Sequence, residues 1–135
     1  QLQRADTAAF DKIMAAFALP KGDPDEKRAR SRAIQAATRE AIEVPLRVLE
    51  RAVRALDPVE VALTGNDNAR SDAGVAALVL RAAAEGAWYN VAINLSGFKD
   101  PTLSAEFRAR GEAAIGVVRQ RTEAISAKVR ADLGA

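Results

Sequence analysis

Apolar residues recur three and four positions apart along most of the chain, which is the spacing of one face of an α-helix. The first segment with this spacing runs from about Leu2 to Ala18. The face predicted to be buried carries Phe10, Ile13, Met14 and Phe17. Pro20 and Gly22 follow, and they predict the end of this helix because proline disfavours helix at the residue before it.

The second predicted helix is long and runs from Pro24 to about Leu56. Asp23 is expected to cap it, since Glu26 stands at the third helical position and completes a capping box. Pro45 lies inside this segment and predicts a kink, because its ring removes a backbone hydrogen bond. The pair Asp57-Pro58 is expected to end the helix, with one short turn after it at 59–63.

A third helix is predicted from about Ser71 to Ile93, after a polar segment that begins at Gly65. A stripe with little side-chain bulk recurs every four positions along it, at Gly74, Leu78, Ala82 and Gly86. Such a stripe would let the backbone of a neighbouring helix come close. A fourth helix is predicted from the Asp100-Pro101 pair to about Leu133. The pattern therefore predicts one all-α domain over residues 1–135, an antiparallel bundle of long, kinked helices.

Composition narrows the chemistry that this chain can perform. Hydrophobic residues make up 49% of the chain but aromatic residues only 4%, which suits closely packed helices. The chain has no cysteine and no histidine, which excludes disulfides, the ligands of a zinc deaminase and Ser-His nucleophiles. We therefore predict no metal, and we expect carboxylates, lysine or tyrosine to move protons. The absence of cysteine is compatible with the cytoplasmic localisation that we predict.

Charge and hydropathy argue against two kinds of partner. Twenty basic residues are spread among eighteen acidic ones, for a net charge of +2. This mixture is typical of a solvated surface rather than of a basic stripe that binds nucleic acid. No apolar run approaches the roughly 18 residues of a membrane span, and no signal peptide is visible. We predict that neither nucleic acid nor a membrane is a partner.

Two carboxylates are candidates for acid–base chemistry. Asp72 lies where the polar segment enters the third predicted helix, and a helix N-terminus stabilises a carboxylate by roughly 0.3–1 kcal/mol. The same position suits a purely structural role, in which Ser71 and Asp72 cap the helix. Asp6 shares a helical face with Phe10, and an acid on an apolar face suits a general acid or base. The alternative for Asp6 is an ion pair with an arginine of another helix.

Six short stretches follow one another in an order and at spacings that are known from one family of enzymes. They are residues 6–11, 19–21 with 26–27, 43–46, 65–66, 71–76 and 90–95. Together they resemble the cyclodeaminase/cyclohydrolase family of folate enzymes, which includes the cyclodeaminase part of formiminotransferase-cyclodeaminase and bacterial methenyltetrahydrofolate cyclohydrolases. Members of the family begin with a further helical segment that carries a Pro-Gly-Gly-Gly motif, and this sequence has none. We therefore expect that an N-terminal part of the family's pocket is missing here.

The resemblance implies one-carbon chemistry on a reduced folate, with no cofactor besides that substrate. The first expectation is a cyclodeaminase, which closes 5-formiminotetrahydrofolate to 5,10-methenyltetrahydrofolate and releases ammonia. The alternative is a cyclohydrolase, which opens the methenyl bridge with water to give 10-formyltetrahydrofolate. A second alternative is a non-catalytic module for folate binding or oligomerisation.

The resemblance also implies roles for polar residues. The expected substrate contacts are Lys21, Asn66, Arg70, Ser71, Asn90 and Asn94, and the expected catalytic groups are Asp72 and Asp6. Lys21 and Arg70 are cations placed in predicted loops, where they would meet the glutamate tail of folate or remain solvated. Asn90 and Asn94 lie one turn apart, where their amides would pair with the pterin ring or end the helix.

Helical geometry limits how these residues can share one site. Asp72 and Asn90 are eighteen residues apart, which is about 27 Å along a helix axis. They cannot both touch one reacting centre within a single subunit. Since the resemblance implies a dimer, we expect a homodimer whose sites lie near the subunit interface and are shared between the two copies.

Overall fold

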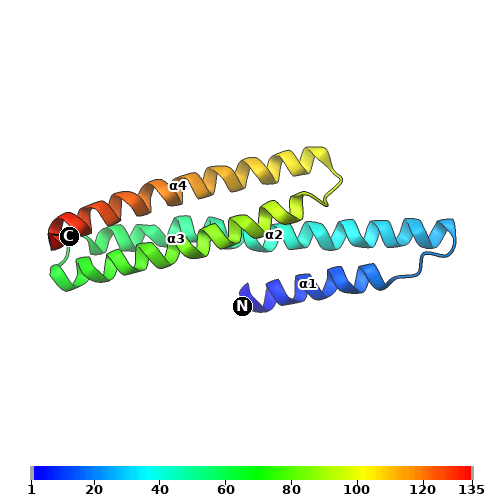
Figure 1. The fold of residues 1–135 in the computed structure, drawn as a ribbon, viewed down its shortest axis with the longest axis horizontal. Coiled ribbons are helices and arrows are strands. Elements are labelled where there is room, and N and C mark those ends of the chain that lie inside the picture. The colour runs from blue at the N-terminus through cyan, green and yellow to red at the C-terminus, as the bar shows by residue number, and fades with distance from the viewer. Residues whose placement is uncertain (1, 135) are drawn as a thin grey trace.

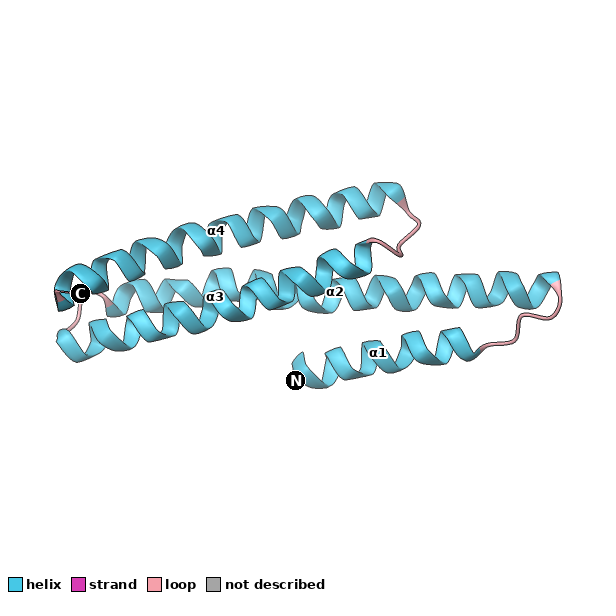
Figure 2. Ribbon diagram, viewed as in Figure 1, coloured by secondary structure: helices cyan, strands magenta, loops and turns pink. Residues whose placement is uncertain are grey.

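The computed structural model describes the backbone of residues 2–134 and the side chains of residues 7–134 (Figure 1). It contains four helices: α1 (Leu2–Ala18), α2 (Pro24–Ala62), α3 (Asp67–Leu95) and α4 (Pro101–Leu133). Successive helices run antiparallel, and short connections at 19–23, 63–66 and 96–100 join them (Figure 2). The predicted all-α bundle is confirmed. None of the described helices is long and apolar enough to cross a membrane.

The longest helix, α2, belongs to two packing units. Its C-terminal half forms a three-helix bundle with α3 and α4, and its N-terminal part extends beyond them with α1 alongside (Figure 1). Within the described chain, α1 packs against α2 alone. In the arm formed by α1 and the start of α2, each helix is therefore covered by fewer neighbouring helices than in the three-helix bundle.

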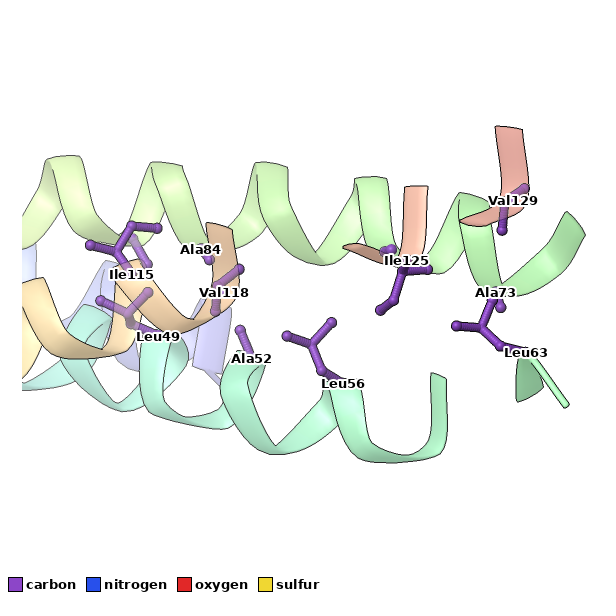
Figure 3. Close-up of a cluster of buried hydrophobic side chains, with 12 residues drawn as sticks. Leu49, Ala52, Leu56, Leu63, Ala73, Ala84, Ile115, Val118, Ile125 and Val129 are labelled. Carbon is purple, nitrogen blue, oxygen red and sulfur yellow. The ribbon is translucent and has the colours of Figure 1, made fainter. Parts of the chain in front are cut away.

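The main core lies between α2, α3 and α4. Figure 3 shows Leu49, Ala52 and Leu56 of α2 turned toward Ile115 and Val118 of α4. On the α3 side of this core the buried residues are Ala73, Ala77, Ala84 and Ala87. These small side chains let α3 lie close to both neighbours, as the alanine-rich composition predicts.

The predicted caps of α2 and α4 are confirmed. The Asp23 carboxylate accepts hydrogen bonds from the backbone N–H groups of Asp25 and Glu26 at 2.8 Å, and the Glu26 carboxylate accepts one from the backbone of Gly22. At the start of α4, Asp100 accepts a hydrogen bond from the Leu103 N–H at 2.9 Å. These side chains satisfy backbone donors that have no partner inside their own helices.

The predicted end of the second helix at Asp57-Pro58 is wrong, because α2 continues through Pro45 and Pro58 to Ala62. The reason lies on α4. Arg121 donates hydrogen bonds to the Val53 carbonyl at 3.1 Å, to Asp57 at 2.8 Å and to Glu60 at 2.7 and 2.8 Å. The Arg121 guanidinium thus binds groups before and after Pro58 and stabilises both helical turns. A kink at Pro45 stays a prediction.

The predicted buried face of the first helix is confirmed for Ile13, which is partly buried against Ala41 and Val44 of α2, and is wrong for its other three residues. Phe10, Met14 and Phe17 are 61%, 54% and 52% exposed, whereas Ala9 and Ala16 are buried against α2. Because α1 packs against only one of the described helices, a single narrow stripe of its surface is covered. The small alanines give the closest approach to α2, and the large side chains remain outside.

The third helix begins at Asp67, four residues before the predicted start at Ser71. Asn66 caps it by accepting a hydrogen bond from the Ala69 N–H at 3.0 Å. Ser71 and Asp72 therefore lie in the second turn and do not cap the helix. The four-residue stripe from Gly74 to Gly86 does not follow one packed face, because each step of four residues rotates by about 40°. Gly74 lies against Val129, and Gly86 faces open space.

Gly111 on α4 is a position where adding one methyl group should lower the stability of the fold. A Cβ atom at this position would overlap the indole ring of Trp88 on α3. We expect Gly111→Ala to lower the free energy of unfolding by roughly 1–3 kcal/mol, because the overlap forces the two helices apart. Gly116→Ala is the matched control on the same helix, since a Cβ there meets nothing within 4 Å. It should be neutral or raise stability by up to about 1 kcal/mol in urea denaturation.

Candidate functional site

The predicted site residues lie at the two ends of α3. Asn66, Arg70, Ser71 and Asp72 gather at its N-terminal end, and Asn90 and Asn94 lie near its C-terminal end. Lys21 lies in the connection between α1 and α2, which is at the same end of the molecule as the last turn of α3 (Figure 1). The side chain of Asp6 lies outside the described residues. The chain thus holds two groups of candidate residues that are separated along α3.

At the N-terminal end, Arg70 and Asn66 have structural partners. Arg70 lies in the first turns of α3 rather than in a loop, and its guanidinium donates to the Gly65 carbonyl at 3.1 Å. It also lies 3.6 Å from Asp67 and 3.7 Å from Asp132, so it ties the start of α3 to the end of α4. Asn66 is the N-cap. Both side chains hold the helix in place.

Asp72 and Ser71 differ from these two neighbours. Both side chains are exposed, and no hydrogen bond or ion pair joins the Asp72 carboxylate to another described residue. The residue that follows, Ala73, is buried in the main core and fixes this turn of the helix. The Asp72 carboxylate therefore stands on a helical turn that the core fixes in place, and it is exposed.

At the C-terminal end, the two asparagines have different surroundings. The Asn94 amide donates to the Ala41 carbonyl of α2 at 3.3 Å and to the Asn90 carbonyl at 2.8 Å. It therefore fastens the end of α3 to α2. The Asn90 side chain is exposed, so its amide can accept and donate hydrogen bonds to a ligand.

Lys21 lines an open cleft of about 400 Å³ between the α1–α2 arm and the connection from α3 to α4. The apolar part of the cleft is made by Phe17 and Ile34, and Ser31 and Gln35 supply hydroxyl and amide groups. Its basic residues are Lys21, Lys27, Arg30 and Lys99. A volume of this size accommodates a small molecule. The combination of an apolar floor and cations suits a ligand with an organic body and carboxylate groups.

Two residues hold the walls of this cleft. Arg30 donates to the Phe17 carbonyl at 3.1 and 3.2 Å and lies 5.5 Å above the Phe17 ring, which fixes the end of α1. Gln35 donates to the Gly97 carbonyl at 3.2 Å and accepts from the Lys99 N–H at 2.7 Å, which fixes the connection at 96–100. Both walls are thus attached to α2, and the cleft needs no rearrangement to form.

The three lysines of the cleft have no acidic partner among the described residues. Neither Lys21, Lys27 nor Lys99 takes part in an ion pair there, whereas the acids nearby are engaged in the capping box and with Arg28. Sequence reasoning identified Lys21 but missed Lys27 and Lys99. Lys99 reaches this cleft only because the α3–α4 connection is fastened to Gln35, a contact across 64 residues that spacing along the chain does not reveal.

Two bidentate ion pairs among the described residues lie outside this cleft and fasten α4 to its neighbours. Arg119 binds Glu85 of α3 through two hydrogen bonds of 2.7 Å, and this lowers the pKa of the Glu85 carboxyl. Arg121 lowers the pKa of Glu60 on α2 in the same way, through its hydrogen bonds. These carboxylates remain charged and paired. A group that exchanges protons near neutral pH needs a pKa close to that pH, and these paired carboxylates have lowered pKa values instead.

Comparison with known proteins connects these features to one family. The family model described as formiminotransferase-cyclodeaminase matches residues 1–113. The chain is 42% identical over 108 residues to the pig formimidoyltransferase-cyclodeaminase, covering 78% of this chain and 20% of that protein. It is 41% identical over 102 residues to the methenyltetrahydrofolate cyclohydrolase of Methylorubrum extorquens AM1, covering 75% of this chain and 49% of that protein.

The fold is similar to that of a solved structure. The crystal structure of formiminotetrahydrofolate cyclodeaminase from Thermotoga maritima matches with a TM-score of 0.68 and 28% sequence identity. The match covers 96% of this chain and 59% of that chain. This chain therefore spans a fifth to three fifths of the length of these three relatives.

Proposed function

The chain belongs to the formiminotransferase-cyclodeaminase family, and on that premise we propose that it interconverts one-carbon units on a reduced folate. The first proposed reaction is conversion of 5-formiminotetrahydrofolate to 5,10-methenyltetrahydrofolate and ammonia. The second is hydrolysis of the methenyl bridge to 10-formyltetrahydrofolate. The observation that carries this proposal is the near-equal identity, 42% and 41%, to a cyclodeaminase and to a cyclohydrolase. The fold match to a cyclodeaminase favours the first reaction.

Both reactions pass through a tetrahedral one-carbon centre that is bonded to N5 and N10 of the folate. In the cyclodeaminase reaction N10 attacks the formimino carbon, a new C–N10 bond forms, and the former imine nitrogen leaves as ammonia after it gains protons. In the cyclohydrolase reaction water adds to the methenyl carbon, the C–N5 bond breaks, and a proton returns to N5. Each requires a group that takes a proton and gives one back, which a carboxylate can do.

We assign this proton transfer first to Asp72 and second to Asp6. Asp72 combines an available carboxylate with a rigid helical position, as described above. Asn90 and Ser71 are the proposed polar contacts to the pterin, because both side chains are exposed. Asn66, Arg70 and Asn94 have structural partners, so we place them beside the substrate rather than at its reacting carbon.

Lys21 is proposed to bind the glutamate tail of the folate in the cleft near the end of α1. We expect Lys21→Ala to raise KM roughly threefold to tenfold and to leave kcat unchanged, because a carboxylate contact far from the reacting carbon contributes to binding only. Lys128→Ala is the control, since Lys128 is an exposed lysine on α4 outside the cleft. A fall in kcat for Lys21→Ala, or the same KM for both variants, would contradict this role.

The separation of the two groups of residues leads to a proposal about assembly. Asp72 and Asn90 lie on one continuous helix, about 27 Å apart along its axis. We propose a homodimer in which Asp72 of one copy and Asn90 of the other complete each site. A folate-binding or oligomerisation module without activity is the alternative from a different class.

Ammonia release tests the reaction itself. The chain is incubated with 5-formiminotetrahydrofolate, and ammonia is measured with a coupled enzymatic assay. Faster release than in buffer supports the cyclodeaminase. No release, together with faster loss of methenyltetrahydrofolate, supports the cyclohydrolase, and folate binding without either reaction supports the module.

A further inference from the structure

The cleft between the α1–α2 arm and the connection at 96–100 is lined by charges of one sign. Its cations are Lys21, Lys27, Arg30 and Lys99, and none of its described lining residues is an aspartate or a glutamate. The chain as a whole is balanced, with eighteen acidic residues to twenty basic ones. A cleft lined by one sign of charge raises the local concentration of ligands of the opposite sign. We call it the cationic cleft.

The three lysines of the cationic cleft take no part in the ion pairs that hold the fold together. Among the side chains of residues 7–134, the one lysine in an ion pair is Lys12, which lies outside the cleft. The acids nearest in the sequence are already engaged: Asp23, Glu26 and Asp100 accept hydrogen bonds from backbone N–H groups at the helix starts, and Asp25 pairs with Arg28. The lysine charges are therefore left for a ligand.

Three separate elements supply these lysines. Lys21 lies in the connection at 19–23, Lys27 lies on α2, and Lys99 lies in the connection at 96–100, which meets α2 beyond the end of α3 (Figure 1). Gln35 holds the backbone N–H of Lys99 at 2.7 Å and leaves its ammonium group unbound. Ser31, one turn after Lys27, adds an exposed hydroxyl to the same wall. An anion in the cleft can thus be contacted by three elements at once.

The apolar part of the cleft offers a surface for a planar ring. Phe17 is 52% exposed, and Ile34 lies beside it in the lining. The Arg30 guanidinium lies 5.5 Å from the centre of the Phe17 ring and is held there by the Phe17 carbonyl. Guanidinium groups stack on aromatic rings as well as binding anions. The cleft therefore suits a ligand with an aromatic ring at one end and several negative charges at the other.

We propose that the cationic cleft binds a nucleoside polyphosphate. Its phosphates lie against Lys21, Lys27 and Lys99, and its base lies on the Phe17–Arg30 pair. Lysine binds phosphate as a point charge, whereas the planar fork of an arginine suits a carboxylate, and the one arginine of this cleft is engaged with a carbonyl. A triphosphate carries about four negative charges at neutral pH, which matches the cations of the cleft better than the α- and γ-carboxylates of one glutamate do.

The composition of the lining determines how this ligand binds and what it excludes. Since no carboxylate lines the cleft, nothing there can hold a divalent cation beside the phosphates. Binding therefore needs no Mg²⁺, and Mg²⁺ weakens it by neutralising part of the phosphate charge. The nucleotide also occupies the position of Lys21, so it competes with the glutamate tail of a folate for the cleft. That consequence alone rests on the proposed function.

Titration calorimetry with adenosine triphosphate (ATP), in buffer without Mg²⁺, tests the binding directly. The wild-type chain should bind ATP with a Kd below about 1 mM. Lys27→Ala and Lys99→Gln should each weaken binding about fivefold, as expected for an exposed charged contact. Lys99→Gln keeps the backbone N–H that binds Gln35, so the connection stays in place. Lys128→Ala is the matched control, because Lys128 is an exposed lysine outside the cleft, and its Kd should be unchanged.

Two further probes test the chemical class of the ligand. Tripolyphosphate should bind more weakly than ATP because it lacks the base, and citrate should bind more weakly than ATP because its carboxylates carry fewer charges. No ATP binding at about 1 mM, a requirement for Mg²⁺, equal loss of affinity in Lys128→Ala, or binding of either probe as tight as that of ATP would overturn the proposal. The titrations contain no folate and measure no turnover, so their outcome is separate from that of the proposed function.

Discussion

Replacing Asp72 with asparagine is expected to lower the turnover of the proposed folate substrate at least 100-fold. The carboxylate is the proposed group that takes and returns a proton, and such transfer contributes about 10²–10⁴-fold to a rate. An amide of the same shape cannot perform it. The side chain is exposed and joins no other described residue, so the melting temperature should stay the same. Steady-state kinetics and thermal unfolding measured on the same preparation check both halves of this prediction.

Asp67→Asn is the matched control for this experiment. Asp67 is also an exposed aspartate at the start of α3, five residues earlier, and its carboxylate lies 3.6 Å from the Arg70 guanidinium. A contact of this kind contributes little to stability. The control variant should keep turnover close to that of the wild type. Equal turnover in Asp72→Asn and Asp67→Asn would show that Asp72 does not transfer the proton, and Asp6 would then be the first candidate.

Mixing two inactive variants is expected to restore activity if each site is shared between two copies. Asp72→Asn damages one end of the shared site and Asn90→Leu damages the other end. A dimer with one copy of each variant has one site with both defects and one site with none. Since half of the dimers are mixed after random exchange, turnover should recover to about a quarter of the wild-type rate. The assay is the same kinetic measurement on an equimolar mixture.

Two variants at the same end of the site provide the control for mixing. Asp72→Asn and Ser71→Leu both damage the N-terminal end of α3, so no combination of these copies contains an intact site. This mixture should show no recovery. Absence of recovery in the first mixture as well, with dimers present by sedimentation, would show that each subunit holds its own complete site.

Much of the fold follows from short-range rules, and the caps show why. Asp23 with Glu26 and Asp100 with Pro101 mark the starts of two helices, and the hydrogen bonds involved span three or four residues. Local sequence contains all the partners of such contacts. The long helices were predictable for the same reason, because their apolar spacing is visible in the sequence.

The errors in the predicted helices come from contacts between distant residues. Continuation of α2 past Pro58 depends on Arg121, which reaches back across more than sixty residues. The exposed position of Phe10 depends on how many helices surround α1, and spacing along one helix carries no such information.

The candidate site was predictable only in part. Lys21, Asp72 and Asn90 are exposed, whereas the predicted ligand contacts Arg70 and Asn94 donate hydrogen bonds to carbonyl groups of the same chain. A sequence indicates which side chains can form hydrogen bonds but not whether a neighbouring element already satisfies them. The cationic cleft was missed because residues from α1, α2 and the α3–α4 connection form it together.

The measurement that tests the central claim most directly is the ultraviolet absorbance of methenyltetrahydrofolate in the presence of this chain. Its appearance is followed from 5-formiminotetrahydrofolate, and its loss is followed in a separate reaction, under buffer conditions that keep spontaneous hydrolysis slow. Faster appearance than in buffer is the predicted result, and faster loss would establish the cyclohydrolase instead. If the chain accelerates neither reaction, and Asp72→Asn behaves like the wild type in both, the proposal that this chain converts folates is contradicted.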